Sequence, residues 1–435
     1  MTKIYVAFVL LSLCFLSSSR YIKLKNNLIS TALKHILLSL ALGASVTMAA
    51  AVPEYHNPVA PEFPILAWYS ILPDSAQTPG RYDELREAGF NISFSHFYHE
   101  EQLDAALKAA KGTGIKIMGT STGVYNNTRE TITKYKDNPG IAGWFMRDEP
   151  VAAAFAGLSV LRDSIFAADQ NKHLMYLNLL PIFVAPKDLG TRDYEEYVQR
   201  FVDEVRLPLI SYDLYPIVRD DSTGTVYWRE RHFENLEVVS RVARRNNMPF
   251  WAFCLATAHH PYPVPEEAHM RFEAFTALAY GAQGIEYFTY WQPPTGTWDF
   301  HHAPIDETGK RTDVYYKIKT INSEIQALAP VFLGAVVDDV SFVGPHIPVG
   351  TKAMTALPEG FESITADGET LLVSQFHNGK NRYIMLVNAD IDHAQTVKAK
   401  RRKGLRRYIP DGTTTPDDPS RPIVLAPGSY YLARY

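Results

Sequence analysis

Arg147, Asp148 and Glu149 stand at the end of a run of apolar residues and directly before Pro150, in the segment GWFMRDEP. A short apolar run of this kind is typical of a buried strand. Proline ends such a strand, because it holds the preceding residue extended and has no N–H to donate. Carboxylates at the tip of a buried strand can hold and transfer protons. The segment therefore predicts a strand that delivers Glu149 to a site of proton transfer.

Polar and aromatic side chains also end most other apolar runs of the chain. Including the tip of GWFMRDEP, the residues predicted to contact a substrate are Trp68, His96, Arg147, Asp148, Asn178, Tyr215, His259, Tyr290 and Trp291. Amide, imidazole, guanidinium and carboxylate groups exchange hydrogen bonds with hydroxyls, while aromatic rings offer flat apolar faces. This mixture suits a sugar, so the predicted partner is a carbohydrate.

The elements that would position these residues alternate regularly between strand and helix. The predicted strands lie in residues 63–72, 91–97, 115–121, 141–149, 173–181, 207–217, 249–257 and 284–291. Each is a short apolar run, as expected where both faces of a parallel sheet are buried. A doubly wound open sheet would alternate as well, but no G-x-G-x-x-G or phosphate-binding loop follows any of these runs. We therefore predict an α/β fold, a (β/α)₈ barrel over residues 60–334, whose functional groups gather where the strands end.

The alternation of strand-like and helix-like segments stops near residue 335. Short strand-like runs follow, separated by the turn signals ADGET and HNGKN at residues 366–370 and 377–381. Such turns join the strands of antiparallel hairpins. We predict a small all-β sandwich domain over residues 335–435.

These features resemble the clan A glycoside hydrolases, which are (β/α)₈ enzymes with a β-sandwich appendage. In that clan the fourth strand ends Asn-Glu-Pro, with the glutamate as general acid/base, and the eighth often ends in a tryptophan that floors the sugar site. The resemblance spans residues 63–330 and implies that Glu149 is the acid/base and Trp291 the floor. Two departures stand out: Asp148 replaces the asparagine, and FWAFCLATAHH, at residues 250–260, lacks the glutamate that ends the seventh strand.

Cleavage of a glycosidic bond commonly needs two carboxylates. Asp213, in SYDLYP, is the predicted partner of Glu149, because it ends a strand and is flanked by tyrosines. An equally open interpretation is that Asp213 orients Arg147 or a substrate hydroxyl. Glu286 lies deeper in its strand and is predicted to be structural.

The alternation of side chains along a regular strand places Arg147 and Glu149 on one face and Asp148 on the other. If Arg147 pairs with Glu149, it lowers the pKa of that carboxyl. Asp148 is accordingly predicted to bind substrate.

Composition limits the other classes of function. The formal net charge is −4 and basic residues form no long run, so nucleic acid is not a predicted partner. Histidines that could hold a metal are His96, His99, His259, His260, His301 and His302. No H-E-x-x-H motif or cysteine cluster accompanies them, and we predict neither a metal nor another cofactor.

Residues 1–51 have the composition of a leader. A basic stretch from Arg20 precedes an apolar run that ends in small residues around Ala49, the order of a secretory signal. Export to the periplasm or the medium is therefore predicted, with membrane contact only through an uncleaved leader; a two-pass membrane anchor is the alternative interpretation. Beyond the leader the sequence keeps one cysteine, Cys254, and so no internal disulfide.

The prediction from sequence is an exported glycoside hydrolase that acts on an oligo- or polysaccharide, with Glu149 and Asp213 as catalytic residues. One alternative is a carbohydrate-binding protein on a degenerate hydrolase barrel. Another is a metal-dependent hydrolase that uses the histidines at the ends of the strands.

Overall fold

A computed structural model describes residues 53–74 and 76–435, and the predicted leader lies outside these residues. Residues 52–435 form one compact unit. Within the described residues, no helix is both long enough and apolar enough to cross a membrane.

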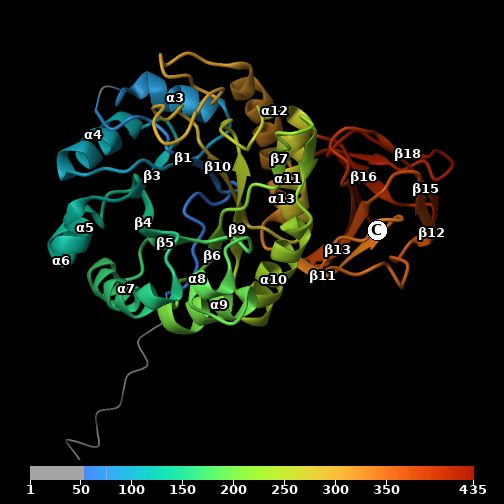
Figure 1. Cartoon of the computed structure of the whole chain (residues 1–435), viewed down its shortest axis with the longest axis horizontal. Coiled ribbons are helices and arrows are strands. Elements are labelled where there is room, and N and C mark those ends of the chain that lie inside the picture. The colour runs from blue at the N-terminus through green and yellow to red at the C-terminus, as the bar shows by residue number, and fades with distance from the viewer. Residues whose placement is uncertain (1–52, 75) are drawn as a thin grey trace, which may run out of the picture. The chain divides into compact units, whose positions relative to one another are not determined.

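Eight parallel strands close into a barrel (Figure 1). They are β1 (Ile65–Trp68), β2 (Ile92–Ser93), β3 (Lys116–Gly119), β4 (Ile141–Asp148), β5 (Leu174–Leu179), β6 (Ile210–Tyr212), β9 (Phe250–Leu255) and β10 (Gly284–Phe288). The barrel closes where β10 pairs with β1, with Ile65 opposite Ile285 and Trp68 opposite Phe288. The predicted (β/α)₈ fold is confirmed.

Helices follow the strands and cover the outside of the barrel. They are α3 (Pro79–Glu87), α4 (Glu100–Ala110), α5 (Thr122–Asn126), α6 (Thr128–Tyr135), α7 (Phe155–Asp169), α8 (Pro186–Leu189), α9 (Tyr194–Arg200), α10 (Arg231–Arg245), α11 (Glu267–Ala279), α12 (Asp313–Ala327) and α13 (Ala329–Phe332). A short hairpin of β7 (Ile217–Arg219) and β8 (Val226–Trp228) follows β6. Apolar residues at helical spacing face the strands; in α10 they include Phe233, Leu236, Val239 and Val242.

Alternate residues of each strand face the interior of the barrel, because side chains alternate across a strand. Leu66 and Trp68 belong to the interior cluster, whereas Ile65 and Ala67 pack against the helices. The interior is filled by large side chains, among them Phe145, Tyr176 and Trp251. It is therefore a packed core, and space for a ligand remains only at its ends.

The C-terminal part forms two antiparallel sheets with a shared core. One has the order β11 (Val336–Val343), β13 (Leu371–Asn378), β14 (Asn381–Asn388), β19 (Tyr430–Arg434), β16 (Arg406–Tyr408) and β17 (Thr414–Pro416). The other has the order β12 (Phe361–Ala366), β15 (Gln395–Arg401) and β18 (Ile423–Leu425). Buried side chains of both sheets pack together, including Ile364, Val373, Leu386 and Val397. This arrangement is the predicted sandwich.

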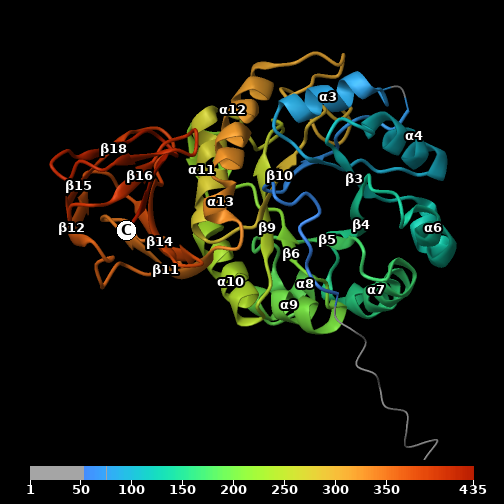
Figure 2. The ribbon, with the colours of Figure 1, turned by 180° about the vertical axis from the view of Figure 1, so that it is seen from behind.

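The sandwich lies against α11 of the barrel, which separates it from the strands in both views (Figures 1 and 2). The rings of Phe275 and Tyr430 are 4.3 Å apart between centroids. The hydroxyl of Ser374 donates to the carbonyl oxygen of Ala279 at 2.6 Å. The sandwich thus supports a helix on the outside of the barrel, away from the ends of the strands.

Candidate functional site

A cavity of about 280 Å³ lies where the barrel strands end. The residues that line it are Trp68, Asp148, Glu149, Asn178, Pro181, Phe183, Asp213, Leu214, Tyr215, Phe253, His259, Tyr262, Phe288, Trp298 and Phe300. Six of the residues predicted to contact substrate or catalyse lie directly at or after strand ends in this set: Trp68, Asp148, Glu149, Asn178, Asp213 and His259. Tyr215 joins them from the segment after β6.

The tip of β4 departs from a regular strand. The register between β4 and β5 shifts between Phe145 and Arg147, and Glu149 has a φ of 45°. Side chains therefore stop alternating at this point, and Asp148 and Glu149 both line the cavity. The prediction that Asp148 faces away from Glu149 is wrong for this reason. The backbone N–H of Glu149 donates to the carbonyl oxygen of Asn178 at 2.9 Å and fixes the turn.

Arg147 is exposed, as are Asp148 and Glu149, but unlike them it does not line the cavity. Among the ion pairs of the described residues, none joins Arg147 to Glu149, and Arg147 is not among the groups that shift the pKa of Glu149. Burial raises the pKa of Asp148, and the hydrogen bond from Asn178 and the positive charge of Arg147 oppose this rise.

Glu149 and Asp213 form a carboxyl pair in hydrogen-bonding contact. Burial and the nearby charges of Glu149 and Asp148 raise the pKa of Asp213 well above its usual range. The pKa of Glu149 is raised as well, first by burial and then by the charge of Asp148. Two carboxyl groups in contact cannot both ionise without strong repulsion. A hydrogen bond with Asp213 lowers the pKa of Glu149 against the larger effects that raise it, so ionisation of one carboxyl disfavours ionisation of the other.

Asn178 joins this pair to Asp148. Its side-chain amide donates to Asp148 Oδ1 at 3.2 Å and to Asp213 Oδ1 at 3.0 Å. Both donated bonds come from one NH₂ group, so the amide oxygen must face the barrel interior. There it accepts from the hydroxyl of Ser211 at 3.1 Å. Asn178 was predicted to bind substrate, and in the structure its amide holds the carboxylates of Asp148 and Asp213 in place.

The network continues into the barrel and ends at Glu286, which is fully buried. Glu286 Oε2 lies 2.9 Å from the hydroxyl of Ser211 and 2.9 Å from that of Tyr176. Burial raises the pKa of Glu286 to about 8. The depth of Glu286 agrees with the structural role predicted from the sequence. Ser211 and Asn178 nevertheless connect it by hydrogen bonds to the carboxylates at the cavity.

The remaining wall of the cavity is aromatic. Ring centroids of Tyr215 and Phe288 are 5.7 Å apart, and His259 packs 4.8 Å from Tyr262 and 4.8 Å from Phe300. Burial lowers the pKa of His259, which favours the neutral ring. A neutral imidazole among aromatic rings suits the binding of an uncharged group better than the transfer of a proton.

Besides Arg147, three predicted contact residues lie outside the cavity lining. The ring of Tyr290 is buried 5.4 Å from that of Phe90. Trp291 stacks on Arg81 of α3 at 5.0 Å, so the prediction that it floors the site is not supported by its position. His96 packs against Trp68, with the two ring centroids 6.0 Å apart. Trp68 itself lines the cavity and takes the place assigned to Trp291.

Several lining residues were missed in the sequence. Trp298 and Phe300 belong to the long segment between β10 and α12 and line the cavity. The side chain of Trp298 is 51% exposed, an unusual position for so large an apolar group. The sequence signal for them was the length and aromatic content of this segment, because long loops at the carboxyl ends of barrel strands carry function.

Among the described residues, no group of three or more histidine, cysteine, aspartate or glutamate side chains is arranged to hold a metal ion. His301 and His302 contact each other, with their Nδ1 atoms 2.8 Å apart. His259 faces aromatic rings.

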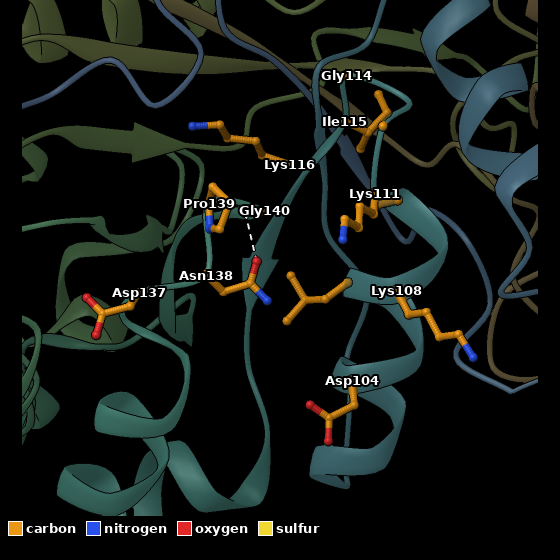
Figure 3. A pocket seen from close by; sticks show the side chains of 13 residues that line it. Asp104, Lys108, Lys111, Gly114, Ile115, Lys116, Asp137, Asn138, Pro139 and Gly140 are labelled. Carbon is orange, nitrogen blue, oxygen red and sulfur yellow. Dashed lines mark hydrogen bonds between the residues drawn. The ribbon is translucent and has the colours of Figure 1, made fainter.

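A larger hollow, of about 800 Å³, lies at the amino ends of β3 and β4 (Figure 3). Its lining includes Lys108, Lys111 and Lys116 but no aromatic side chain. Both of its aspartates, Asp104 and Asp137, form ion pairs with lysines. Unlike the cavity at the carboxyl ends, it offers neither a carboxyl pair nor a flat apolar face, and barrel enzymes place their active sites at the other end.

Residues 191–328 match the model of glycoside hydrolase family 42, described as beta-galactosidase. No curated protein matches the chain. A catalytic mutant of a family 42 beta-galactosidase from G. stearothermophilus has a similar structure, with a TM-score of 0.52 at 10% identity over 88% of this chain and 99% of that chain.

Two other beta-galactosidases are similar in structure. That of Bacillus circulans sp. alkalophilus has a TM-score of 0.51 at 10% identity, over 86% of this chain and 99% of that chain. That of the haloarchaeon Halorubrum lacusprofundi has a TM-score of 0.47 at 14% identity, over 61% of this chain; this chain spans only 58% of it. The closed barrel is thus shared with solved beta-galactosidase structures, and residues 191–328 match the family 42 model.

Proposed function

We propose that the protein hydrolyses a glycosidic bond of an oligo- or polysaccharide, with Glu149 as proton donor and Asp213 as the partner that shares its proton. The observation that carries this proposal is that Glu149 and Asp213 line the same aromatic-walled cavity at the carboxyl ends of the strands. A general acid must hold its proton at the working pH. Burial and the charge of Asp148 raise the pKa of Glu149 and so favour its protonated form.

The cavity favours a terminal sugar residue. Its volume is about 280 Å³, below the usual range of ligand pockets, and Trp298 and Phe300 line it from the long loop after β10. A single pyranose ring between Trp68 and Tyr215 would bring its glycosidic oxygen to the carboxyl pair. Because the matching family model is described as beta-galactosidase, β-galactosides are the first class of substrate to test.

Hydrolysis of p-nitrophenyl glycosides by the full-length protein tests this proposal. We expect release of p-nitrophenol from at least one member of a panel of β-galactoside, β-glucoside, β-mannoside and N-acetyl-β-hexosaminide. Glu149→Gln should lower kcat by about 10²- to 10⁴-fold, the usual contribution of a general acid. Glu101→Gln, on the exposed face of α4, is the matched control and should leave kcat unchanged. Full activity in Glu149→Gln would overturn the assignment.

One observation favours a second candidate, a carbohydrate-binding protein. Residues 256–259, which follow β9, carry no carboxylate where the clan places its nucleophile. A binding protein would turn over no member of the panel, and its affinity for an oligosaccharide in calorimetry would be equal in wild type and Glu149→Gln. Turnover of any glycoside that depends on Glu149 excludes this candidate.

Export is a separate proposal that rests on the sequence of residues 20–51. Expression of the full chain in a Gram-negative host, followed by fractionation and N-terminal sequencing, tests it. Export predicts a periplasmic product that begins close to Ala51; a full-length product in the membrane or cytoplasmic fraction would contradict it.

A further inference from the structure

The backbone of Glu149 has a conformation that its surroundings must hold. Its φ of 45° lies in the left-handed region, which is uncommon for a residue with a side chain. Such a conformation persists only where neighbouring groups fix it. On one side, the N–H of Glu149 donates to the carbonyl oxygen of Asn178 at 2.9 Å. On the other side the ring of Pro150 restricts φ, so a group that holds the Pro150 carbonyl also holds the turn that carries the carboxyl.

The hydroxyl of Tyr197 is that group. Tyr197 belongs to α9, between β5 and β6, and its hydroxyl donates to the carbonyl oxygen of Pro150 at 2.6 Å. The same hydroxyl accepts from the backbone N–H of Leu180, which directly follows β5, at 3.4 Å. One side chain thereby joins the segment that carries Glu149 to the segment that leaves the neighbouring strand.

The segment after β5 is tied to Asp213 in turn. The backbone N–H of Asp213 donates to the carbonyl oxygen of Leu179, the last residue of β5, at 3.4 Å. Since Leu179 and Leu180 are adjacent, a path of hydrogen bonds leads from the Pro150 carbonyl through Tyr197 to the backbone of Asp213. This path determines where the segments that carry the two carboxyl groups lie relative to each other.

Tyr197 is itself held firmly and lies outside the cavity lining. Its side chain is fully buried, and its ring centroid lies 5.5 Å from that of Phe155 and 6.0 Å from that of Tyr194. Burial raises the pKa of Tyr197, and the charges of Glu149 and Asp213 raise it further. The hydroxyl therefore keeps its proton and remains a donor.

We infer, on the basis of the proposed hydrolase function, that Tyr197 is a positioning residue whose hydroxyl places the proton donor Glu149 against the glycosidic oxygen. Without this hydroxyl the buried carbonyl of Pro150 loses its donor, and the turn at Glu149 is held on one side only. A misplacement of about 1 Å can lower a rate by about 100-fold. Proton donation should therefore suffer, while the residues that line the cavity stay as they are.

Two leaving groups separate this role from a merely structural one. The full-length protein is assayed with the phenyl and the 2,4-dinitrophenyl glycoside of one sugar. Phenolate needs a proton from Glu149 to leave, whereas dinitrophenolate leaves without one. We expect Tyr197→Phe to lower kcat/KM by about 10- to 100-fold with the phenyl glycoside and by less than about 3-fold with the dinitrophenyl glycoside.

Tyr194→Phe is the matched control. The hydroxyl of Tyr194 donates to the carbonyl oxygen of Leu180 at 3.1 Å, so it reaches the segment after β5 but not the segment that carries Glu149. Thermal unfolding should show similar losses of Tm in Tyr194→Phe and Tyr197→Phe. Only Tyr197→Phe should make kcat/KM depend more strongly on the leaving group.

A double variant supplies a second readout. In the Glu149→Gln background the proton that Tyr197 positions is gone, so Tyr197→Phe should lower kcat/KM by less than about 2-fold further. Unchanged kcat/KM in Tyr197→Phe, equal losses with both leaving groups, or additive losses in the double variant would overturn this inference and leave the hydrolase function standing. If the wild-type protein hydrolyses neither kind of glycoside with any sugar, the hydrolase function and the inference both fail.

Discussion

The hydroxyl of Ser211 lies 2.9 Å from Glu286 Oε2 and thereby links the buried centre of the barrel to the carboxylates at its end. Ser211 also lies 3.1 Å from Asn178 Oδ1, which can only accept a hydrogen bond. Ser211 has one hydroxyl proton, so at any moment it donates either to Asn178 Oδ1 or to Glu286 Oε2. The hydroxyl of Tyr176 also donates to Glu286 Oε2, at 2.9 Å. Burial nevertheless raises the pKa of Glu286 to about 8.

Glu286→Gln should change how stability depends on pH. The pKa of Glu286 is raised from 4.5 to about 8 by burial. Between these values the folded state binds more protons than the unfolded state, so the free energy of unfolding falls as the pH rises. Glutamine cannot ionise. Between pH 5 and pH 8 the Tm of Glu286→Gln should therefore fall by about 2 °C less than the Tm of the wild-type protein. Differential scanning calorimetry at both pH values measures this; parallel curves for the two proteins would show that Glu286 stays in one ionisation state.

Asp148→Asn should shift the pH profile of activity as well as lower the rate. The charge of Asp148 raises the pKa of Glu149. A general acid loses activity as the pH rises through its pKa, so removal of this charge should move the alkaline limb of kcat/KM to lower pH. Initial rates from pH 4 to pH 9 measure the shift. A limb that stays in place, or moves to higher pH, would show that Asp148 does not act on the proton donor electrostatically.

Trp298 and Trp291 should respond differently to substitution. Trp298→Ala removes an exposed ring from the cavity lining and should raise KM by about 10-fold or more, with a smaller change in kcat. Trp291→Phe alters a ring that packs on Arg81 and should lower the Tm without changing KM. Steady-state kinetics and thermal unfolding of both variants separate these effects. A raised KM in Trp291→Phe alone would restore Trp291 to the sugar site.

Gly428 tests the contact between the sandwich and α11. It has a φ of 61°, and a Cβ atom there would lie 2.3 Å from the carbonyl oxygen of Ala268. Gly379 has a similar φ of 57° but open space around it. Gly379→Ala should therefore cost only the backbone strain, about 1–2 kcal/mol, whereas Gly428→Ala should destabilise further by about 1–3 kcal/mol from the clash. Denaturant unfolding compares the two, and equal losses would mean that the sandwich yields at this contact.

Much of the site followed from the sequence because parallel barrel strands bring their carboxyl ends to the same rim. Each apolar run that was recognised as a strand therefore placed its last residues at that rim. Trp68, Asn178 and His259 come from three different strands and line one cavity for this reason. The same rule brought Glu149 and Asp213 together across more than sixty residues of sequence.

The rule failed where a strand end was irregular. A register shift in β4 and a positive φ at Glu149 turned Asp148 toward the cavity and left Arg147 outside it. Neither deviation has a signature in RDEP. Trp291 was misplaced because the segment after β10 continues beside β1, where the Trp291 N–H donates to the carbonyl oxygen of Tyr69 at 3.0 Å.

The sequence by itself determined the barrel, the sandwich and the carboxylate at the end of β4, because hydrophobic periodicity and turn residues act locally and are read directly along the chain. Only the tertiary structure decided which carboxylates touch. The position of Glu149 beside Asp213 depends on the positive φ of Glu149. It also depends on the side-chain amide of Asn178, which bonds to Asp213 and accepts a hydrogen bond from Ser211. Such contacts join residues far apart in sequence through packing, and they set the pKa values on which proton transfer depends.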